Sequence, residues 1–312
     1  MLTRRILRIK CLQSLYAFFQ TPNDNMAVAE KNLYKSIENI HDLYIYQLAL
    51  LKALHYQSVQ QMEEGKQKKL PTPQDLSPNT KFVDGQLINI IVNSEELTEF
   101  EDKRKINWLQ HRQELKKILQ QVKTLDTYQT YVANESYNLN DEKNLLISIV
   151  NEVLNENELL DSFYDEVNFN WINELEFVNM MVVKTIKQCK AEEKLNILPI
   201  YKDQDDKDFV GLLFRKPIVK SDEYDKLIRE KAKNWEFERI ALIDVIMMKM
   251  AITEFIEFDS VPVKVSLNEY IELSKAFSTP KSKTFINGIL DRIVVEMKAD
   301  GQIIKRGRGL LE

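Results

Sequence analysis

Three arginines near the start of the chain have a spacing that suits contacts with a polyanion. Arg4, Arg5 and Arg8 lie one, three and four positions apart, so on a helix Arg8 shares a surface with Arg4 or Arg5. A guanidinium group presents a planar fork of donors to phosphate oxygens. The cluster therefore predicts either phosphate contacts or a basic face exposed to water, and this helix alone does not decide between them.

The residues that catalysis or metal binding would need are not grouped in the sequence. His41, His55 and His111 are scattered, without cysteine or carboxylate residues at metal-ligand spacing. The chain has only seven glycines and contains no glycine-rich phosphate loop, nucleophile elbow or dinucleotide fingerprint. We therefore expect a protein that is not an enzyme and has neither a metal nor a cofactor.

Composition favours an all-α fold. The 312 residues are 44% hydrophobic, so the chain can bury one large core or two smaller ones, and 7 Gly with 8 Pro favour long helices over turn-rich sheets. Cys11 and Cys189 lie far apart within apolar helical patterns, as expected for reduced thiols in the core of a cytosolic protein. Basic residues and Gln13 interrupt the apolar N-terminal stretch, which favours an amphipathic helix over a signal peptide. We expect a cytoplasmic protein without a membrane segment.

Charge is unevenly distributed along the chain. Residues 21–204 contain 20 basic and 29 acidic side chains, a net charge of -9, whereas the remainder has 23 basic and 19 acidic side chains, a net charge of +4. A polyanionic partner is therefore expected to meet the two ends of the chain.

Hydrophobic periodicity predicts a series of helices. The most apolar of them, residues 236–258, has hydrophobic side chains around most of its circumference and is expected to be central and nearly buried. After an extended connection, Ser266 to Glu269 has the form of a capping box, which predicts that the next helix begins at Ser266 and ends at Phe277. The other predicted helices or helical stretches are residues 2–20, 27–64 (one helix or two), 105–132, 142–160, 172–188 and a last helix through Phe285 to Met297, and the predicted loops are residues 65–81 and 201–208.

Three segments resemble the NusB family. RRILRIKCLQSLYAF, Arg4 to Phe18, resembles the first helix of that family, and residues 261–293, VPVKVSLNEYIELSKAFSTPKSKTFINGILDRI, resemble its C-terminal signature almost position by position. NWEFERIALIDVIMMKMAITEF, residues 234–255, resembles the preceding helix. The resemblance implies an all-α, NusB-like helical bundle of residues 1–20 plus 205–298, an acidic helical insertion of residues 21–204 and a flexible basic tail of residues 299–312.

The resemblance also implies a function. Members of the NusB family bind the boxA element of nascent ribosomal RNA, a single-stranded RNA, together with the small-subunit ribosomal protein NusE. The pair joins an RNA polymerase antitermination complex. The protein partner would pack on exposed faces of the helices around residues 234–255.

Site residues follow from the same resemblance. Arg4, Arg5 and Arg8 match the family's basic RNA-binding helix, Tyr16 matches an aromatic position on it, and Phe285 matches the aromatic residue that opens the last helix. Basic side chains and stacking rings are how single-stranded RNA is commonly held. Just before Phe285, Lys281, Ser282 and Lys283 would lie near a helix start that favours phosphate. For the polar residues the alternative is a solvated loop, and for both rings it is core packing. Lys281 departs from members that carry an acidic residue there, which should strengthen attraction to RNA.

Two other functions compete with this expectation. The insertion could serve as a protein-interaction scaffold in a chain that has lost RNA binding, because its acidic charge could screen the RNA surface. RNA methylation is a second alternative, since a NusB-like module precedes some ribosomal RNA methyltransferases. That reaction needs a separate α/β cofactor domain, and no segment of this sequence fits one.

Overall fold

The computed structural model describes residues 1–21, 25–155, 157–168, 171, 174–233 and 235–310. These residues form helices joined by loops and contain no strand, which confirms the all-α prediction. They divide into two compact units, one of residues 1–37 with 200–312 and one of residues 38–199. Our division at residues 20/21 and 204/205 differs from these bounds and stays a prediction.

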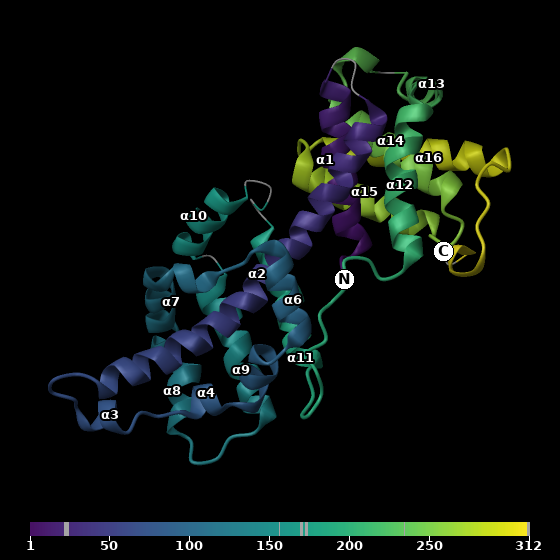
Figure 1. The fold of residues 1–312 in the computed structure, drawn as a ribbon. Helices are drawn as coiled ribbons and strands as arrows, with labels where there is room; N and C mark the ends of the chain where they lie inside the picture. The colour runs from purple at the N-terminus through teal and green to yellow at the C-terminus, as the bar shows by residue number, and fades with distance from the viewer. Residues whose placement is uncertain (22–24, 156, 169–170, 172–173, 234, 311–312) are drawn as a thin grey trace. The chain divides into compact units, whose positions relative to one another are not determined.

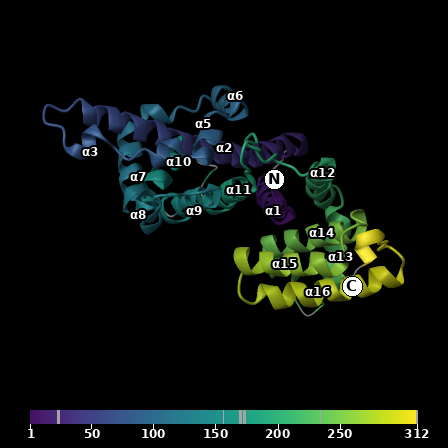
Figure 2. The same cartoon turned by 90° about the horizontal axis from the view of Figure 1, so that it is seen from below.

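The unit of residues 1–37 and 200–312, called unit 1 below, is built around one helix. Every residue of α14 (Leu242–Glu257) from Asp244 to Phe255 is buried, and this confirms the prediction of a central helix. It packs against its neighbours α1, α12, α13, α15 and α16, and Figure 2 shows α14, α15 and α16 side by side. Its neighbours are α1 (Arg4–Gln20), α12 (Gln204–Val219), α13 (Ser221–Lys231), α15 (Val263–Phe277) and α16 (Ser282–Ala299), with the 3₁₀ turns η4 (Phe237–Arg239) and η5 (Gly307–Leu310).

Two predicted helix starts in unit 1 were wrong. The central helix begins at Leu242 and not near residue 236, since the 3₁₀ turn η4 and Ile240 come first. Helix α15 begins at Val263, three residues before Ser266. Pro262 occupies the N-cap position of α15, and no side chain there forms a capping hydrogen bond. The expected capping box does not form because Ser266 and Glu269 both contact residues of other helices.

The described part of the C-terminal tail is fixed to the end of α14. Lys305 Nζ donates to the carbonyl oxygens of Glu254 at 3.1 Å and of Phe258 at 2.8 Å, and a lysine in this position satisfies carbonyls that a helix end leaves unpaired. The backbone of Gly309 passes so close to Asp259 that a Cβ atom would lie 1.8 Å from its carbonyl oxygen. These contacts hold residues 305–309 against α14, and the flexibility expected of residues 299–312 stays a prediction; residues 311–312 lie outside the described part.

The unit of residues 38–199, called unit 2 below, is organised along the part of α2 (Met26–Lys66) that follows residue 37 (Figure 1). α2 is a single helix, where the sequence allowed one or two. The predicted loop 65–81 contains the short helix α3 (Pro73–Leu76), and the stretch 105–132 divides into several helices. The remaining elements are α4 (Lys81–Asp84), α5 (Gln86–Val92), α6 (Glu95–Arg104), η1 (Trp108–Gln110), α7 (Arg112–Thr124), α8 (Asp126–Ala133), α9 (Leu139–Ser148), the π-helical η2 (Ile149–Leu154), α10 (Glu158–Val167) and α11 (Leu175–Gln188). Unit 2 carries 26 acidic and 17 basic residues, so its net charge is -9.

Unit 2 is expected to lose stability in mild acid because of His41. Nε2 of this buried ring donates to the carbonyl oxygen of Leu198 at 3.0 Å, and Nδ1 accepts from Arg104 at 3.2 Å. Burial lowers the pKa of His41 to about 4. Between the unfolded value of about 6.5 and this value the unfolded chain binds a proton that the folded unit does not, so stability falls as pH falls.

We expect this effect to reach about 2 kcal/mol across that pH range. A His41→Gln variant removes the titration and keeps a hydrogen-bonding side chain. Urea unfolding at pH 7 and pH 4.5 should therefore show a smaller loss of stability for the variant than for the wild type. Equal losses in the two proteins would contradict the assignment.

Candidate nucleic-acid interface

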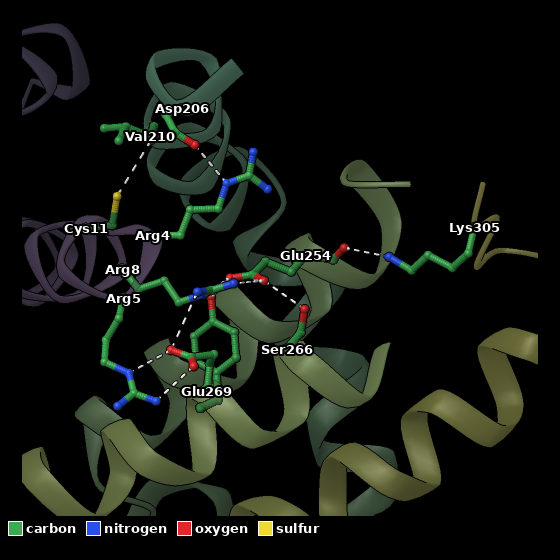
Figure 3. A network of polar contacts seen from close by, with 11 residues as sticks. Arg4, Arg5, Arg8, Cys11, Asp206, Val210, Glu254, Ser266, Glu269 and Lys305 are labelled. Atoms are coloured by element: carbon green, nitrogen blue, oxygen red, sulfur yellow. Dashed lines mark hydrogen bonds and ion pairs between the residues drawn. The ribbon is translucent and has the colours of Figure 1, made fainter. Parts of the chain in front are cut away.

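Arg8 belongs to α1, and its side chain lies inside the bundle, against α14. Its side chain is 2% exposed, and its Nε and Nη2 donate to the two carboxylate oxygens of Glu254 at 2.6 and 2.8 Å (Figure 3). Glu254 is fully buried and also accepts from the hydroxyls of Ser266 at 2.7 Å and Tyr270 at 2.6 Å. A buried ion pair is favourable only when its remaining hydrogen-bonding capacity is satisfied, and each carboxylate oxygen of Glu254 accepts from two donors.

This network gives Arg8 a structural role. The carboxylate of Glu254 binds both Nε and Nη2 of the guanidinium, so these two nitrogens do not reach a phosphate. The third nitrogen, Nη1, lies 3.6 Å from Glu269. Burial raises the pKa of Tyr270 well above its usual value, so the phenol keeps the proton that it donates to Glu254. In this structure Arg8 joins α1 to α14, and its predicted contact with RNA stays a prediction.

Arg4 and Arg5 differ from Arg8 because they reach the surface. Arg5 donates two hydrogen bonds to Glu269, at 3.0 and 2.9 Å, which lower the pKa of that carboxyl. Arg4 donates to Asp206 at 2.9 Å. The side chain of Arg5 is 53% exposed and that of Arg4 is 34% exposed, whereas the partner of Arg4, Asp206, is buried. Ion pairs between exposed side chains are worth about 0–1 kcal/mol, so a phosphate competes most readily for Arg5.

Tyr16 lies on the surface of α1. It is 39% exposed, and its hydroxyl accepts a hydrogen bond from Gln20 at 3.2 Å. The ring is therefore accessible for stacking, and core packing does not account for it.

The predicted loop before Phe285 separates into accessible and buried residues. Lys281 is exposed at the N-cap of α16, Lys283 is exposed in its first turn, and Phe285 is half-buried. Ser282, in contrast, is 5% exposed, and its hydroxyl lies 2.9 Å from the hydroxyls of both Ser278 and Thr279. These contacts fix the start of α16, and the RNA contact predicted for Ser282 stays a prediction.

Phe285 belongs to an aromatic pair that sequence reasoning missed. Its ring meets Trp235 edge to face, with ring centroids 5.2 Å apart, and Trp235 is 62% exposed. Both rings line a cavity of about 760 Å³. The signal that could have identified Trp235 is the mixture of basic and aromatic residues in the segment 233–239. Asn234 in this segment lies outside the described residues.

Four cationic side chains line the same cavity: Lys231, Arg239, Lys281 and Arg292. Arg239 pairs with Glu236 on the surface at 2.7 Å, and Lys231 pairs with Glu296. Lys281 has no ion-pair partner in the part of the chain that the structure describes. Both Ala241 and Lys281, the N-caps of α14 and α16, also line the cavity, so two helix N-termini add positive potential there.

The protein partner was expected on exposed faces of the helices around residues 234–255, and the structure limits which of these residues are accessible. Residues 244–255 are buried on every side by the other helices of unit 1, so a partner protein has no surface to contact there. Accessible side chains are confined to its beginning, including Trp235 and Arg239.

The described residues show no arrangement typical of a metal site or a membrane span. No group of three or more histidine, cysteine or acidic side chains is arranged to hold a metal ion there. Within the same residues, no helix combines the length and apolar character needed to span a membrane. Cys11 and Cys189 are both buried and unpaired, as predicted for core thiols.

Comparison with known proteins gives a consistent assignment. The model of the NusB family matches residues 166–295. A transcription antitermination protein NusB from Salinibacter ruber is 43% identical over 124 residues, which are 39% of this chain and 78% of that relative. Proteins of the same name from Chloroherpeton thalassium and Natranaerobius thermophilus are 44% and 40% identical, over 34% and 23% of this chain and 50% and 52% of the relatives. The chain thus spans about half of these last two. No solved structure matches the chain.

Proposed function

Since the chain belongs to the NusB family, we propose that it is a non-enzymatic RNA-binding adaptor in transcription antitermination of ribosomal RNA operons. It binds boxA-like single-stranded RNA together with a NusE-type small-subunit ribosomal protein, and the pair joins the RNA polymerase antitermination complex in the cytoplasm. The observation that carries the proposal is the cavity at Trp235 and Phe285, where an exposed ring, a half-buried ring and four cations occur together.

The chemistry of this cavity suits single-stranded RNA. Unpaired bases stack on accessible aromatic rings, each contributing about 1–3 kcal/mol, while cationic side chains follow the phosphates. Trp235 and Phe285 offer the rings, and Lys281 offers a cation that forms no ion pair within the described residues. Arg4, Arg5, Tyr16 and Lys283 stay proposed as further RNA contacts.

Binding of boxA-like RNA tests the proposal. The purified full chain is titrated with fluorescently labelled boxA-like RNA, with and without a NusE-type protein, at moderate salt. We expect binding by the chain alone and tighter binding when the protein partner is present. Absence of RNA binding in both cases would rule the proposal out.

The competing function is a helical scaffold that has lost RNA binding. The charge of -9 on unit 2 favours this alternative, because a strongly acidic unit repels polyanions. It predicts that the chain binds a NusE-type protein but no RNA in the same experiment.

The surface arginines of α1 give a more specific prediction. In an Arg4→Gln, Arg5→Gln double variant we expect the slope of log K against log salt to become less negative by up to about 1.4, because each lost phosphate contact on a single strand removes about 0.7. Arg8 is left intact so that the bundle stays folded. The matched control is Lys103→Gln, Lys190→Gln, two exposed lysines of unit 2 that also form surface ion pairs. Equal slopes for the wild type and the arginine variant would remove Arg4 and Arg5 from the RNA contacts.

A further inference from the structure

Asp244, in the first turn of α14, has an unsatisfied hydrogen-bond acceptor. The residue is 4% exposed, and its Oδ1 is buried without a hydrogen-bond partner among the described residues. Most buried polar atoms in proteins are hydrogen-bonded, because an unmade bond costs the full desolvation of the group. Asp244 also lines the cavity of Trp235 and Phe285. The missing partner is therefore expected to come from whatever occupies this cavity.

The surroundings restrict what that partner is. It must donate a hydrogen, which excludes a phosphate oxygen. A cationic ligand is disfavoured because Lys231, Arg239, Lys281 and Arg292 line the same cavity. A neutral N–H group on a planar ring satisfies both conditions, and the rings of Trp235 and Phe285 suit such a ring. A phosphate attached to it would lie among the cations and the two helix N-termini.

We propose that this cavity receives one unpaired base of the bound RNA and that Asp244 Oδ1 accepts a hydrogen bond from the exocyclic amino group of that base. The inference rests on the proposed RNA function and adds base selectivity to it. Carboxylates accept from the amino group of cytosine in nucleic-acid recognition, and adenine and guanine also carry such a group. Uracil carries no amino group. Its single Watson–Crick N–H is flanked by two carbonyl oxygens, which a carboxylate repels. The site therefore favours adenine, cytosine or guanine over uracil.

A matched pair of RNAs tests the selectivity. A five-nucleotide RNA carries uridines around a central adenosine, and the matched RNA carries purine riboside, which lacks the amino group and has no other Watson–Crick donor. Quenching of tryptophan fluorescence reports binding, and a Trp235→Phe variant identifies the part of the signal that comes from the cavity. For wild-type protein we expect the amino-bearing RNA to bind about tenfold more tightly than its partner.

Variants of Asp244 locate the source of the preference. Asp244→Leu keeps a similar shape without an acceptor, so the tenfold difference should disappear. Asp244→Asn keeps a neutral acceptor and should retain part of it. The charge control is Asp300→Asn, an exposed residue at the C-cap of α16, which should keep the full difference. Circular dichroism and the urea midpoint confirm that each variant is folded.

The outcomes separate this inference from the proposed function. If wild-type protein binds these RNAs and boxA-like RNA but does not distinguish the members of the pair, the amino-group contact is wrong and the RNA function stands. A difference that persists in Asp244→Leu overturns the contact as well. If the wild type binds none of the RNAs, including boxA-like RNA, both the inference and the proposed function fail.

Discussion

An Arg8→Met variant is expected to lose about 3–5 kcal/mol of the free energy of unfolding of unit 1. Methionine fills much of the volume of the arginine but leaves Glu254 as a fully buried carboxylate without its cation. Ser266 and Tyr270 still donate to Glu254, yet hydroxyl donors do not compensate a full charge in a buried site. Urea unfolding followed by circular dichroism measures the loss.

Two controls separate the buried pair from general effects of charge. Arg5→Met removes an exposed partner of Glu269 and should cost about 1 kcal/mol or less. The double variant Arg8→Met, Glu254→Gln no longer has an uncompensated charge and should recover part of the stability lost in Arg8→Met. A loss below about 1 kcal/mol for Arg8→Met would contradict its structural role, since broken buried pairs cost more than surface pairs.

Removing three cations from the cavity is expected to weaken binding of boxA-like RNA about 100-fold at moderate salt. The variant is Arg239→Gln, Lys281→Gln, Arg292→Gln, and each cation is expected to contribute about 1 kcal/mol through a charge-assisted contact with phosphate. The slope of log K against log salt should also become less negative by about 2, because three counterion-releasing contacts are lost. Fluorescence anisotropy titrations at several salt concentrations measure both quantities.

A control with the same change of charge makes this prediction specific to the cavity. Lys103→Gln, Lys116→Gln, Lys190→Gln removes three cations that are paired on the surface of unit 2. We expect only a small, uniform decrease in affinity from this variant. If both triple variants weaken binding equally, the RNA responds to net charge and not to the cavity.

Local patterns predicted much of the fold. The hydrophobic residues around α14 identified a central helix, since a helix that is apolar on all sides must be buried. The capping pattern at Ser266 to Glu269 failed because long-range contacts determine both side chains: Ser266 donates to Glu254, and Glu269 accepts from Arg5, 264 residues away. A local pattern does not reveal such competition.

The same limit applies to the candidate site. Arg8 and Glu254 are 246 residues apart in sequence, so spacing within α1 could not show that one arginine of three is buried. Resemblance identified Phe285, but its partner Trp235 lies 50 residues earlier, and the cavity between them depends on how α14 and α16 begin. The sequence thus predicted the kind of chemistry, basic and aromatic, and the structure changed its location.

Photo-cross-linking tests the central claim that RNA bases stack at Trp235 and Phe285. BoxA-like RNA with 5-iodocytidine, a photoreactive base that keeps the exocyclic amino group, at one position at a time is irradiated with the full chain, and mass spectrometry identifies the modified residues. The proposal predicts adducts on Trp235 or Phe285 from at least one position, and their loss with the Trp235→Ala, Phe285→Ala variant. Adducts confined to Tyr16 or to unit 2, with none at the cavity, would contradict it.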